Sequence, residues 1–242
     1  MIDARRNSIE FKVWGRYALF TDPLTKVGGE KCTYQVPTYE ALKGIAKSIY
    51  WKPTLIWVID EVRVMKRIRT QTKGTKPQEF GGGNSLAIYT FLADVEYQVR
   101  AHFEWNEQRP ELKADRNDGK HFAIVSRMLD RGGRQDIFLG TRDCQGYVVP
   151  CRFGSEIGAL DEADELAFGL MFHGFDYPDE CGGHALHARF WRPTMVNGVI
   201  RFPRPEHCVN RKRIREMTVK PFGLDGNICS VEAETLQLGI AP

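Results

Sequence analysis

The chain has 242 residues, of which 42% are hydrophobic and 27% charged, and its formal net charge is +3. This is an ordinary globular balance, and the length allows one large domain or a main domain with a small appendage. The N-terminal segment MIDARRNSIEFKVW lacks the apolar core of a secretory signal, and no apolar run approaches the ~20 residues that span a membrane. We therefore expect a cytoplasmic protein with no membrane partner and with reduced thiols at its six cysteines. These are Cys32, Cys144, Cys151, Cys181, Cys208 and Cys229.

The first two predicted elements are a strand and a helix. Residues 11–22 are rich in aromatic and β-branched side chains, which is typical of a strand. Residues 38–51 place apolar side chains at helical spacing, and Thr38 is a suitable N-cap. Pro53 ends this helix, because the residue before a proline is driven out of the helical region.

The next segments predict two long strands joined by an irregular connection. Residues 55–69 read as a strand that is apolar at first and basic later, and residues 85–105 resume a strand pattern. Between them, residues 70–84 are rich in turn-forming residues and show no periodicity, which predicts a mobile loop or a long hairpin tip.

A second helix and a last strand complete the pattern. Residues 117–129 carry a helical apolar stripe of Phe122, Val125 and Leu129, with Asp118 as the expected cap, and the RGG sequence at 131–133 ends this helix. Residues 135–150 contain the next strand. The order β-α-β-β-α-β predicts an α+β, ferredoxin-like (RRM-like) fold, in which two helices cover one face of an antiparallel sheet.

From about residue 165 the chain consists of short apolar runs and turns, which predict β-hairpins. We expect a main domain over residues 1–195, extended by such strands, and a small β-rich subdomain over 196–242.

Two basic clusters stand out against the near-neutral total charge. They suit a polyanion-binding groove, although solvated strand faces and loops would give the same pattern. The first cluster is Arg63, Lys66, Arg67, Arg69, Lys73 and Lys76, and the second is Arg211, Lys212, Arg213 and Arg215.

Three features that resemble ligand sites are weaker. Cys181, His184, His187 and Cys208 lack the paired spacings of a zinc site, so an incidental turn is favoured. The DEADE run at 161–165 could attract Mg²⁺, but a solvated helix start is the commoner meaning. The GGGN sequence at 81–84 lacks the Lys-Ser/Thr of a phosphate-binding loop. The sequence thus predicts no metal site and no cofactor.

Lys120 and His121 form a better candidate. In the first turn of the second helix, the free backbone N–H groups and the helix dipole favour a phosphate. The dipole disfavours a protonated histidine by about 0.3–1 kcal/mol, which leaves more neutral imidazole for use as a general base. Tyr50, at the end of the first helix, could approach this pair, because both helices of a split βαβ unit lie on one sheet face. A polar start of an ordinary helix and a core tyrosine remain open alternatives.

Several segments occur together in one order: VWGRYALFTDP (13–23), VPTYEALKGIAKSIYWKP (36–53), the basic strand, and DGKHF before IFLGTRD. In this the chain resembles the Cas-five family of type I-C (Dvulg) CRISPR systems, RAMP proteins that process precursor CRISPR RNA. The likeness covers most of residues 8–150. The sequence RTQTKGT replaces a run that is richer in arginine and asparagine in the family.

The resemblance implies an endoribonuclease that cuts at the 3′ base of the repeat hairpin and stays on the 5′ handle within the interference complex. It implies catalytic roles for Tyr50, Lys120 and His121. In the expected reaction the 2′-hydroxyl of the RNA attacks the adjacent phosphate, without a metal, and leaves a 2′,3′-cyclic phosphate. We expect His121 to assist proton transfer, Lys120 to stabilise the phosphorane, and Tyr50 to orient the nucleophile or help a proton move.

The RNA backbone would be held by eight basic residues, with a steep salt dependence. They are Arg63, Lys66, Arg67, Arg69, Lys73, Arg211, Lys212 and Arg213. Two other functions stay open: a non-catalytic subunit that caps the handle, and a metal-dependent nuclease that binds DNA and uses carboxylates such as those at 161–165.

Overall fold

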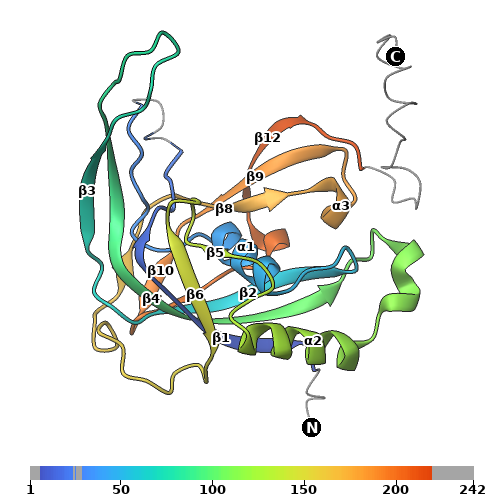
Figure 1. Ribbon diagram of the computed structural model, residues 1–242. Coiled ribbons are helices and arrows are strands. Elements are labelled where there is room, and N and C mark those ends of the chain that lie inside the picture. The colour runs from blue at the N-terminus through green and yellow to red at the C-terminus, as the bar shows by residue number, and fades with distance from the viewer. Residues whose placement is uncertain (1–5, 24, 26–28, 220–242) are drawn as a thin grey trace, which may run out of the picture.

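The computed structural model describes residues 6–23, 25 and 29–219 (Figure 1). Its largest sheet has nine strands that pair in antiparallel fashion, in the order β5-β6-β1-β4-β2-β11-β10-β7, with β3 paired to β4 beside this path. The strands are β1 (Ser8–Ala18), β2 (Leu55–Val64), β3 (Thr70–Thr75), β4 (Ala87–Trp105), β5 (Ile137–Phe138), β6 (Gln145–Pro150), β7 (Leu166–Ala167), β10 (Thr194–Val196) and β11 (Val199–Arg201).

A smaller sheet has the order β12-β9-β8. It consists of β8 (Met171–Asp176), β9 (Ala185–Trp191) and β12 (Asn210–Glu216). The helices are α1 (Tyr39–Ile49), α2 (Asp118–Asp130) and the single-turn α3 (Pro178–Cys181), with 3-10 turns at Pro110–Asp115 and Pro205–His207. None of the helices in the described ranges is long and apolar enough to cross a membrane.

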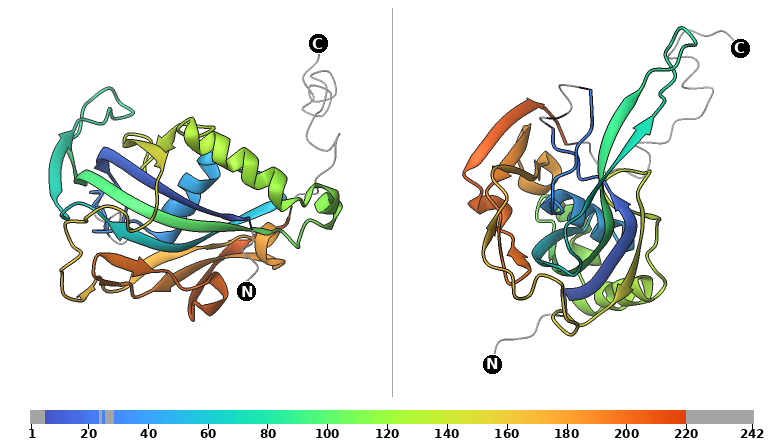
Figure 2. Two further views of the ribbon diagram at one scale, coloured as in Figure 1. Left: turned by 90° about the horizontal axis from the view of Figure 1, so that it is seen from below. Right: turned by 90° about the vertical axis from the view of Figure 1, so that its left-hand side faces the viewer.

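The centre of the large sheet confirms the ferredoxin-like prediction. Its four middle strands run β6-β1-β4-β2, which is the order of a split βαβ fold whose first and third strands are central. Helices α1 and α2 lie on the same face of this sheet (Figure 2) and contact each other. In Figure 1, α1 lies between α2 and the three-stranded sheet, and β8 packs against it.

Helix α1 forms as its sequence predicts. The Thr38 hydroxyl accepts a hydrogen bond from the backbone N–H of Ala41 at 3.2 Å, and so caps the helix start. The apolar side chains at helical spacing are buried against the sheet. Tyr50 is the C-cap residue and has extended backbone angles (φ −161°, ψ 132°), so the last helical residue is Ile49, ahead of Pro53.

Helix α2 differs in two details. The N-cap is Asn117 rather than Asp118: its side-chain oxygen accepts from the Lys120 N–H at 3.0 Å, and Asp118 is the first helical residue. On the predicted stripe, Val125 and Leu129 are buried, whereas Phe122 is only partly buried and the neighbouring His121 is buried instead. The helix therefore buries the imidazole of His121 more deeply than the phenyl ring of Phe122.

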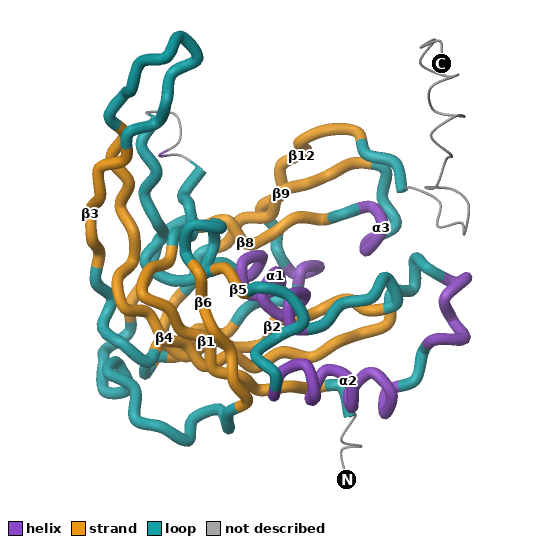
Figure 3. Tube along the Cα trace, in the orientation of Figure 1, coloured by secondary structure: helices purple, strands orange, loops and turns teal. Residues whose placement is uncertain are grey.

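The connection between the two long strands also differs from the prediction. Strand β2 ends at Val64 instead of continuing to 69, and residues 70–75 form β3 rather than a loop. The cause lies in the 19-residue strand β4, which pairs with β2 along residues 97–105 and with β3 along 87–92. At Asp94 its backbone takes a positive φ of 52°, which marks the change of partner. The hairpin of β3 and β4 projects beyond the rest of the molecule (Figures 1, 2 and 3).

The chain after residue 165 forms hairpins, as predicted. The β10–β11 hairpin joins the large sheet next to β2, and β12 joins β9 in the small sheet. The expected boundary between residues 195 and 196 falls inside the β10–β11 hairpin, so described residues on both sides of it share sheets. Residues 220–242 and Cys229 lie outside the described residues, and the division into two domains stays a prediction of the sequence.

Candidate active site

Tyr50 and His121 meet where the end of α1 and the start of α2 come together. The Tyr50 hydroxyl lies 2.9 Å from Nδ1 of His121. Strand β2 fixes the tyrosine from the other side, because the indole N–H of Trp57 donates to the Tyr50 carbonyl oxygen at 2.8 Å. The two side chains thus approach each other as predicted, because both helices lie on one face of the sheet.

His121 is fully buried in an aromatic enclosure. The rings of Phe103 and Trp105, at the end of β4, lie edge-on to the imidazole with centroid distances of 6.3 and 5.6 Å. Nε2 lies 2.8 Å from the backbone carbonyl oxygen of Asp115. Because a carbonyl oxygen can only accept a hydrogen bond, Nε2 carries a proton. In a neutral ring Nδ1 is then unprotonated, and it accepts a hydrogen bond from the Tyr50 hydroxyl.

Lys120 shares the same acidic partner. Its ammonium group lies 2.5 Å from Oδ1 of Asp115, while Oδ2 accepts from the Thr54 hydroxyl at 2.8 Å. Oδ2 also lies 3.4 Å from Nε2 of His121. Asp115, the last residue of the 3-10 turn before α2, thus holds both members of the Lys-His pair. Lys120 remains half-exposed, with 47% of its side-chain surface accessible.

The charges around the pair set two protonation states. Burial, together with the negative charge of Asp115, raises the pKa of Tyr50, so its phenol is neutral and able to donate at neutral pH. Burial alone would raise the pKa of Asp115, but hydrogen bonds from Lys120 and Thr54 outweigh it and lower that pKa. Asp115 is therefore an anion beside the Lys120 cation.

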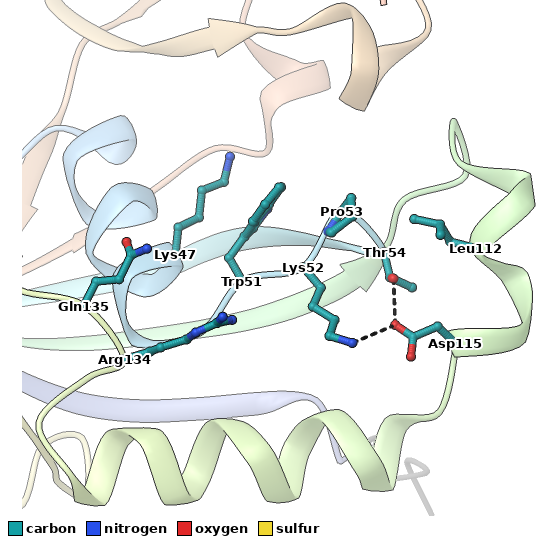
Figure 4. Close-up of a pocket in the computed structure, with 9 residues that line it drawn as sticks. All are labelled: Lys47, Trp51, Lys52, Pro53, Thr54, Leu112, Asp115, Arg134 and Gln135. Atoms are coloured by element: carbon teal, nitrogen blue, oxygen red, sulfur yellow. Dashed lines mark hydrogen bonds and ion pairs between the residues drawn. The ribbon is translucent and has the colours of Figure 1, made fainter. Parts of the chain in front are cut away.

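A pocket of about 880 Å³ opens next to this cluster (Figure 4). It reaches Asp115 and Thr54 on one side and the segment after α2 on the other. Its lining residues are Lys47, Trp51, Lys52, Pro53, Thr54, Leu112, Asp115, Arg134 and Gln135. Tyr50 and His121 are not among the lining residues, but Asp115 is, and its carbonyl oxygen contacts the imidazole.

Arg63 does not face solvent as a member of a basic groove would. It is buried, and its guanidinium forms a two-pronged ion pair with Asp161, the first residue of the acidic run at 161–165. A further N–H donates to Gln98 at 3.2 Å. These contacts give Arg63 a structural role. They also engage the Asp161 carboxylate, one of the groups in the acidic run that could have bound Mg²⁺.

Lys66, Arg67 and Arg69 lie in the connection between β2 and β3, and Lys73 lies on β3. Lys66 and Arg69 both pair with Asp94, at 2.6 and 3.2 Å, whereas Arg67 is exposed and forms no ion pair within the described residues. The ammonium of Lys73 lies 3.2 Å from the ring centroid of Tyr17, a cation–π contact. This surface offers cations and an aromatic ring together.

The second cluster forms most of β12, an edge strand of the small sheet whose residues are all exposed. Arg211 donates to the backbone carbonyls of Cys208 and Pro205, and Arg213 pairs with Glu216. Lys212 is exposed and forms no ion pair in the described part of the chain. The two clusters lie on different sheets.

The other sequence features do not gather into a site. Among the described residues no three of the His, Cys, Asp and Glu side chains, including Cys181, His184, His187 and Cys208, form a group that could hold a metal. The GGGN sequence at 81–84 lies in the tip of the β3–β4 hairpin. The five cysteines within the described ranges are free thiols.

Asp115 and Thr54 are the site residues that sequence reasoning missed. Asp115 sits in a polar connection without periodicity, so the only signal was an acid five positions before Lys120. Thr54 directly follows Pro53 and carried no signal of its own.

A ferredoxin-like sheet with both helices on one face is the fold of RAMP proteins. The chain belongs to the family described as CRISPR-associated protein (Cas_Cas5), whose Cas_Cas5d model matches residues 8–203. The resemblance found in the sequence is thereby confirmed.

Two relatives and one solved structure show the extent of the similarity. A protein of Mannheimia succiniciproducens named CRISPR pre-crRNA endoribonuclease Cas5d is 28% identical over 236 residues, which cover 81% of this chain and 95% of the relative. A protein of the same name from Thermus thermophilus is 29% identical over 177 residues, covering 68% and 73%. A crystal structure of a CRISPR-associated protein is 34% identical, with a TM-score of 0.70 and coverage of 85% of this chain and 96% of the other.

Proposed function

We propose that this chain is an endoribonuclease that cuts precursor CRISPR RNA within its repeat, at the 3′ base of the repeat hairpin. The observation that carries the proposal is the hydrogen bond of 2.9 Å between Tyr50 and His121, beside Lys120 at the start of α2. The activity named for the two relatives supports the same reaction class.

The proposed chemistry uses the RNA's own 2′-hydroxyl. Its oxygen forms a bond to the adjacent phosphorus while the bond from phosphorus to the 5′-oxygen breaks, and the departing 5′-oxygen takes up a proton from solvent water. The products are a 2′,3′-cyclic phosphate and a 5′-hydroxyl. No metal is required. In a neutral ring, Nδ1 of His121 accepts a hydrogen bond from the Tyr50 hydroxyl. The simplest path is therefore a relay, in which Tyr50 takes the 2′-hydroxyl proton as it passes its own proton to His121.

Lys120 supplies the positive charge in this scheme. A phosphorane carries more negative charge than the ground-state phosphate, so a nearby ammonium stabilises the transition state selectively. In the described structure the ammonium is held by Asp115. The phosphate must therefore compete with the Asp115 carboxylate, and a shift of the 3-10 turn Pro110–Asp115 would open the way to Tyr50.

The RNA backbone would run over basic residues that are exposed or partly exposed. Arg67, Lys66, Arg69 and Lys73 line one part of the path, and Lys212, Arg211 and Arg213 the other, whereas Arg63 acts inside the fold. We propose that the product stays bound by its 5′ handle as one subunit of the type I-C interference complex. DNA binding would use the same cations.

The test is cleavage of labelled cognate repeat RNA by pure protein in EDTA. Site-specific cutting that disappears when the nucleotide at the cut carries deoxyribose supports the proposal. Cutting that requires added Mg²⁺ would contradict it and favour the metal-dependent DNA nuclease, for which DNA substrates are run in parallel.

The full burial of His121 favours a second candidate, the non-catalytic subunit that only caps the 5′ handle. Tight binding of the repeat RNA with no cutting, with and without Mg²⁺, would support that function. Substitution of Tyr50 or Lys120 would then leave the binding of the repeat RNA unchanged.

A further inference from the structure

The pocket beside the Tyr50–His121 pair combines apolar walls with cations (Figure 4). Trp51, Pro53 and Leu112 supply the apolar surface, and Lys52 and Arg134 contribute positive charge at its edge. Its volume of about 880 Å³ lies within the usual range of small-molecule sites, about 300–1,000 Å³. An aromatic surface next to positive charge is the arrangement that binds unpaired nucleotides, because bases stack and phosphates pair with the cations.

Trp51 is the distinctive residue of this pocket. Tyr50 has extended backbone angles, so adjacent side chains point in opposite directions: Tyr50 is buried, whereas Trp51 is 42% exposed. No aromatic ring or cation within residues 6–23, 25 and 29–219 stacks on its indole. A large, unstacked aromatic face directly after the candidate catalytic tyrosine leaves room for a base.

Arg134 supplies the best-placed free cation. Its backbone N–H donates to the carbonyls of Ser48 and Ile49, which fixes the segment after α2 against the end of α1. Its guanidinium forms no ion pair with a carboxylate in the described part of the chain, and Figure 4 shows it reaching toward Trp51 and Lys52. The Arg134 charge also acts on Tyr50, where it opposes the rise of the phenol pKa. The guanidinium therefore lies within electrostatic range of the candidate catalytic group.

The neighbouring cations are less free. Lys47 pairs with Glu180 at 2.9 Å, and Lys52 lies 3.9 Å from Oδ2 of Asp115. Lys52 thus connects the pocket to the same carboxylate that holds Lys120 and His121. A nucleotide in the pocket would lie next to a phosphate bound at the Lys-His pair.

We propose that this pocket binds one unpaired nucleotide flanking the cleaved phosphate, with its base stacked on Trp51 and its phosphate on Arg134 and Lys52. The inference rests on the proposed function, since the pocket shares Asp115 with the proposed catalytic residues. In this arrangement Trp51 selects RNA in which the nucleotide at the cut is unpaired. An RNA whose base-paired stem continues across the cut is then a poor substrate.

Stacking is measured with repeat RNAs that carry 2-aminopurine, in turn, at the two positions on each side of the mapped cut, with deoxyribose at the cut to prevent cleavage. We expect the wild-type protein to quench the fluorescence at one position. Trp51→Ala should abolish this quenching and weaken binding about 5- to 150-fold, the range for losing one base–aromatic stack. Trp51→Phe should keep part of both effects, and Tyr147→Ala, which removes an exposed aromatic on β6, should change neither.

Single-turnover cleavage separates binding from chemistry. Trp51→Ala should raise the protein concentration at half-maximal rate more than it lowers the maximal rate, because the stack exists before and during the reaction.

Arg134→Gln should reduce the salt dependence of binding by about 0.7 in log–log slope, as expected for one lost contact with single-stranded RNA. Arg127→Gln on the exposed face of α2 is its matched control.

Unchanged quenching and affinity in Trp51→Ala, with native thermal unfolding, would overturn the inference. Failure of the proposed function has a different signature. If wild-type protein binds but does not cut the all-ribose RNA, while Trp51-dependent quenching persists on the uncleavable RNA, the pocket stands and the cleavage proposal falls.

Discussion

The ammonium of Lys120 lies 2.5 Å from Oδ1 of Asp115, so the cation proposed to stabilise the phosphorane is neutralised within the protein. Such a half-exposed ion pair contributes about 0–1 kcal/mol to stability. The pair can therefore be exchanged for a lysine–phosphate contact at little cost. This separates the effect of Lys120 on catalysis from its effect on folding.

Lys120→Ala should slow single-turnover RNA cleavage by about 10²–10³-fold, the typical effect of losing one group that stabilises transition-state charge. Thermal unfolding should change little. Lys113→Ala, an exposed lysine on the neighbouring 3-10 turn, is the matched control and should cleave at the wild-type rate. Equal rates for the two variants would remove Lys120 from the catalytic site.

Tyr50→Phe keeps the ring and removes the hydroxyl that His121 accepts. We expect cleavage to fall by about 10²–10⁴-fold, because the proposed proton relay is interrupted. The free energy of unfolding should drop by about 1–3 kcal/mol, since Nδ1 of a buried imidazole loses its partner. Tyr34→Phe serves as control: its hydroxyl accepts from the Phe172 N–H elsewhere in the fold. A Tyr50→Phe protein that cleaves normally would contradict the relay.

Arg63 and Arg67 are only four residues apart but should behave in opposite ways. Arg63→Gln breaks a buried ion pair and leaves Asp161 without its cation, which should cost about 3 kcal/mol of stability. Arg67→Gln should leave stability unchanged and weaken RNA binding with a reduced salt slope. Denaturant unfolding and binding at several salt concentrations test both. Weakened RNA binding by Arg63→Gln at full folded population would restore Arg63 to the RNA surface.

His173 predicts a loss of stability in mild acid. The imidazole is buried, stacked on Tyr39 at a centroid distance of 4.2 Å, with Arg189 donating to Nδ1. Burial and the Arg189 charge lower the pKa of His173 to about 3, against 6.5 in the unfolded chain. The unfolded state therefore binds the extra proton below pH 6.5, and stability falls as the pH drops toward 3.

Between pH 7.5 and 5.5 the titration of His173 should lower the free energy of unfolding by about 1 kcal/mol. The measurement is denaturant unfolding of the wild type and His173→Gln at both pH values. The variant, neutral throughout, should lose about 1 kcal/mol less over this interval, whatever its absolute stability. Burial lowers the pKa of His102, but its hydrogen bonds to the Asp60 and Glu104 carboxylates outweigh burial and raise that pKa. His102 therefore acts in the opposite direction, and its effect is common to both proteins. Identical pH dependence would show that His173 titrates normally.

The fold and the contact between Tyr50 and His121 at the candidate site could both be predicted from the sequence, since both follow from local patterns. Thr38 marks the start of α1, helical spacing fixes its buried face, and the order of elements defines which sheet face the helices share. The approach of Tyr50 to His121 follows from that topology. The change of partner along β4 did not follow, because it depends on a positive φ at Asp94 that no periodicity records.

Long-range side-chain pairs were the other failure. Arg63 belongs to a basic run and Asp161 to an acidic one, and each run alone suggests a solvent-facing surface. Only the fold shows that they neutralise each other across 98 positions. The same holds for Asp115: a residue in an irregular connection carries no pattern, although it contacts both Lys120 and His121.

Tyr50 and His121 are 71 positions apart in the chain, and each lies on a different crossover of the split βαβ fold. Their contact therefore cannot form in a nascent chain until α2 has been synthesised and the central strand β4 has joined β1 and β2. Loop-closure entropy makes such distant contacts late events in folding. Under the proposed function, cleavage is thus tied to completion of the tertiary structure, and a fragment that ends before residue 118 lacks the candidate site even if α1 forms correctly.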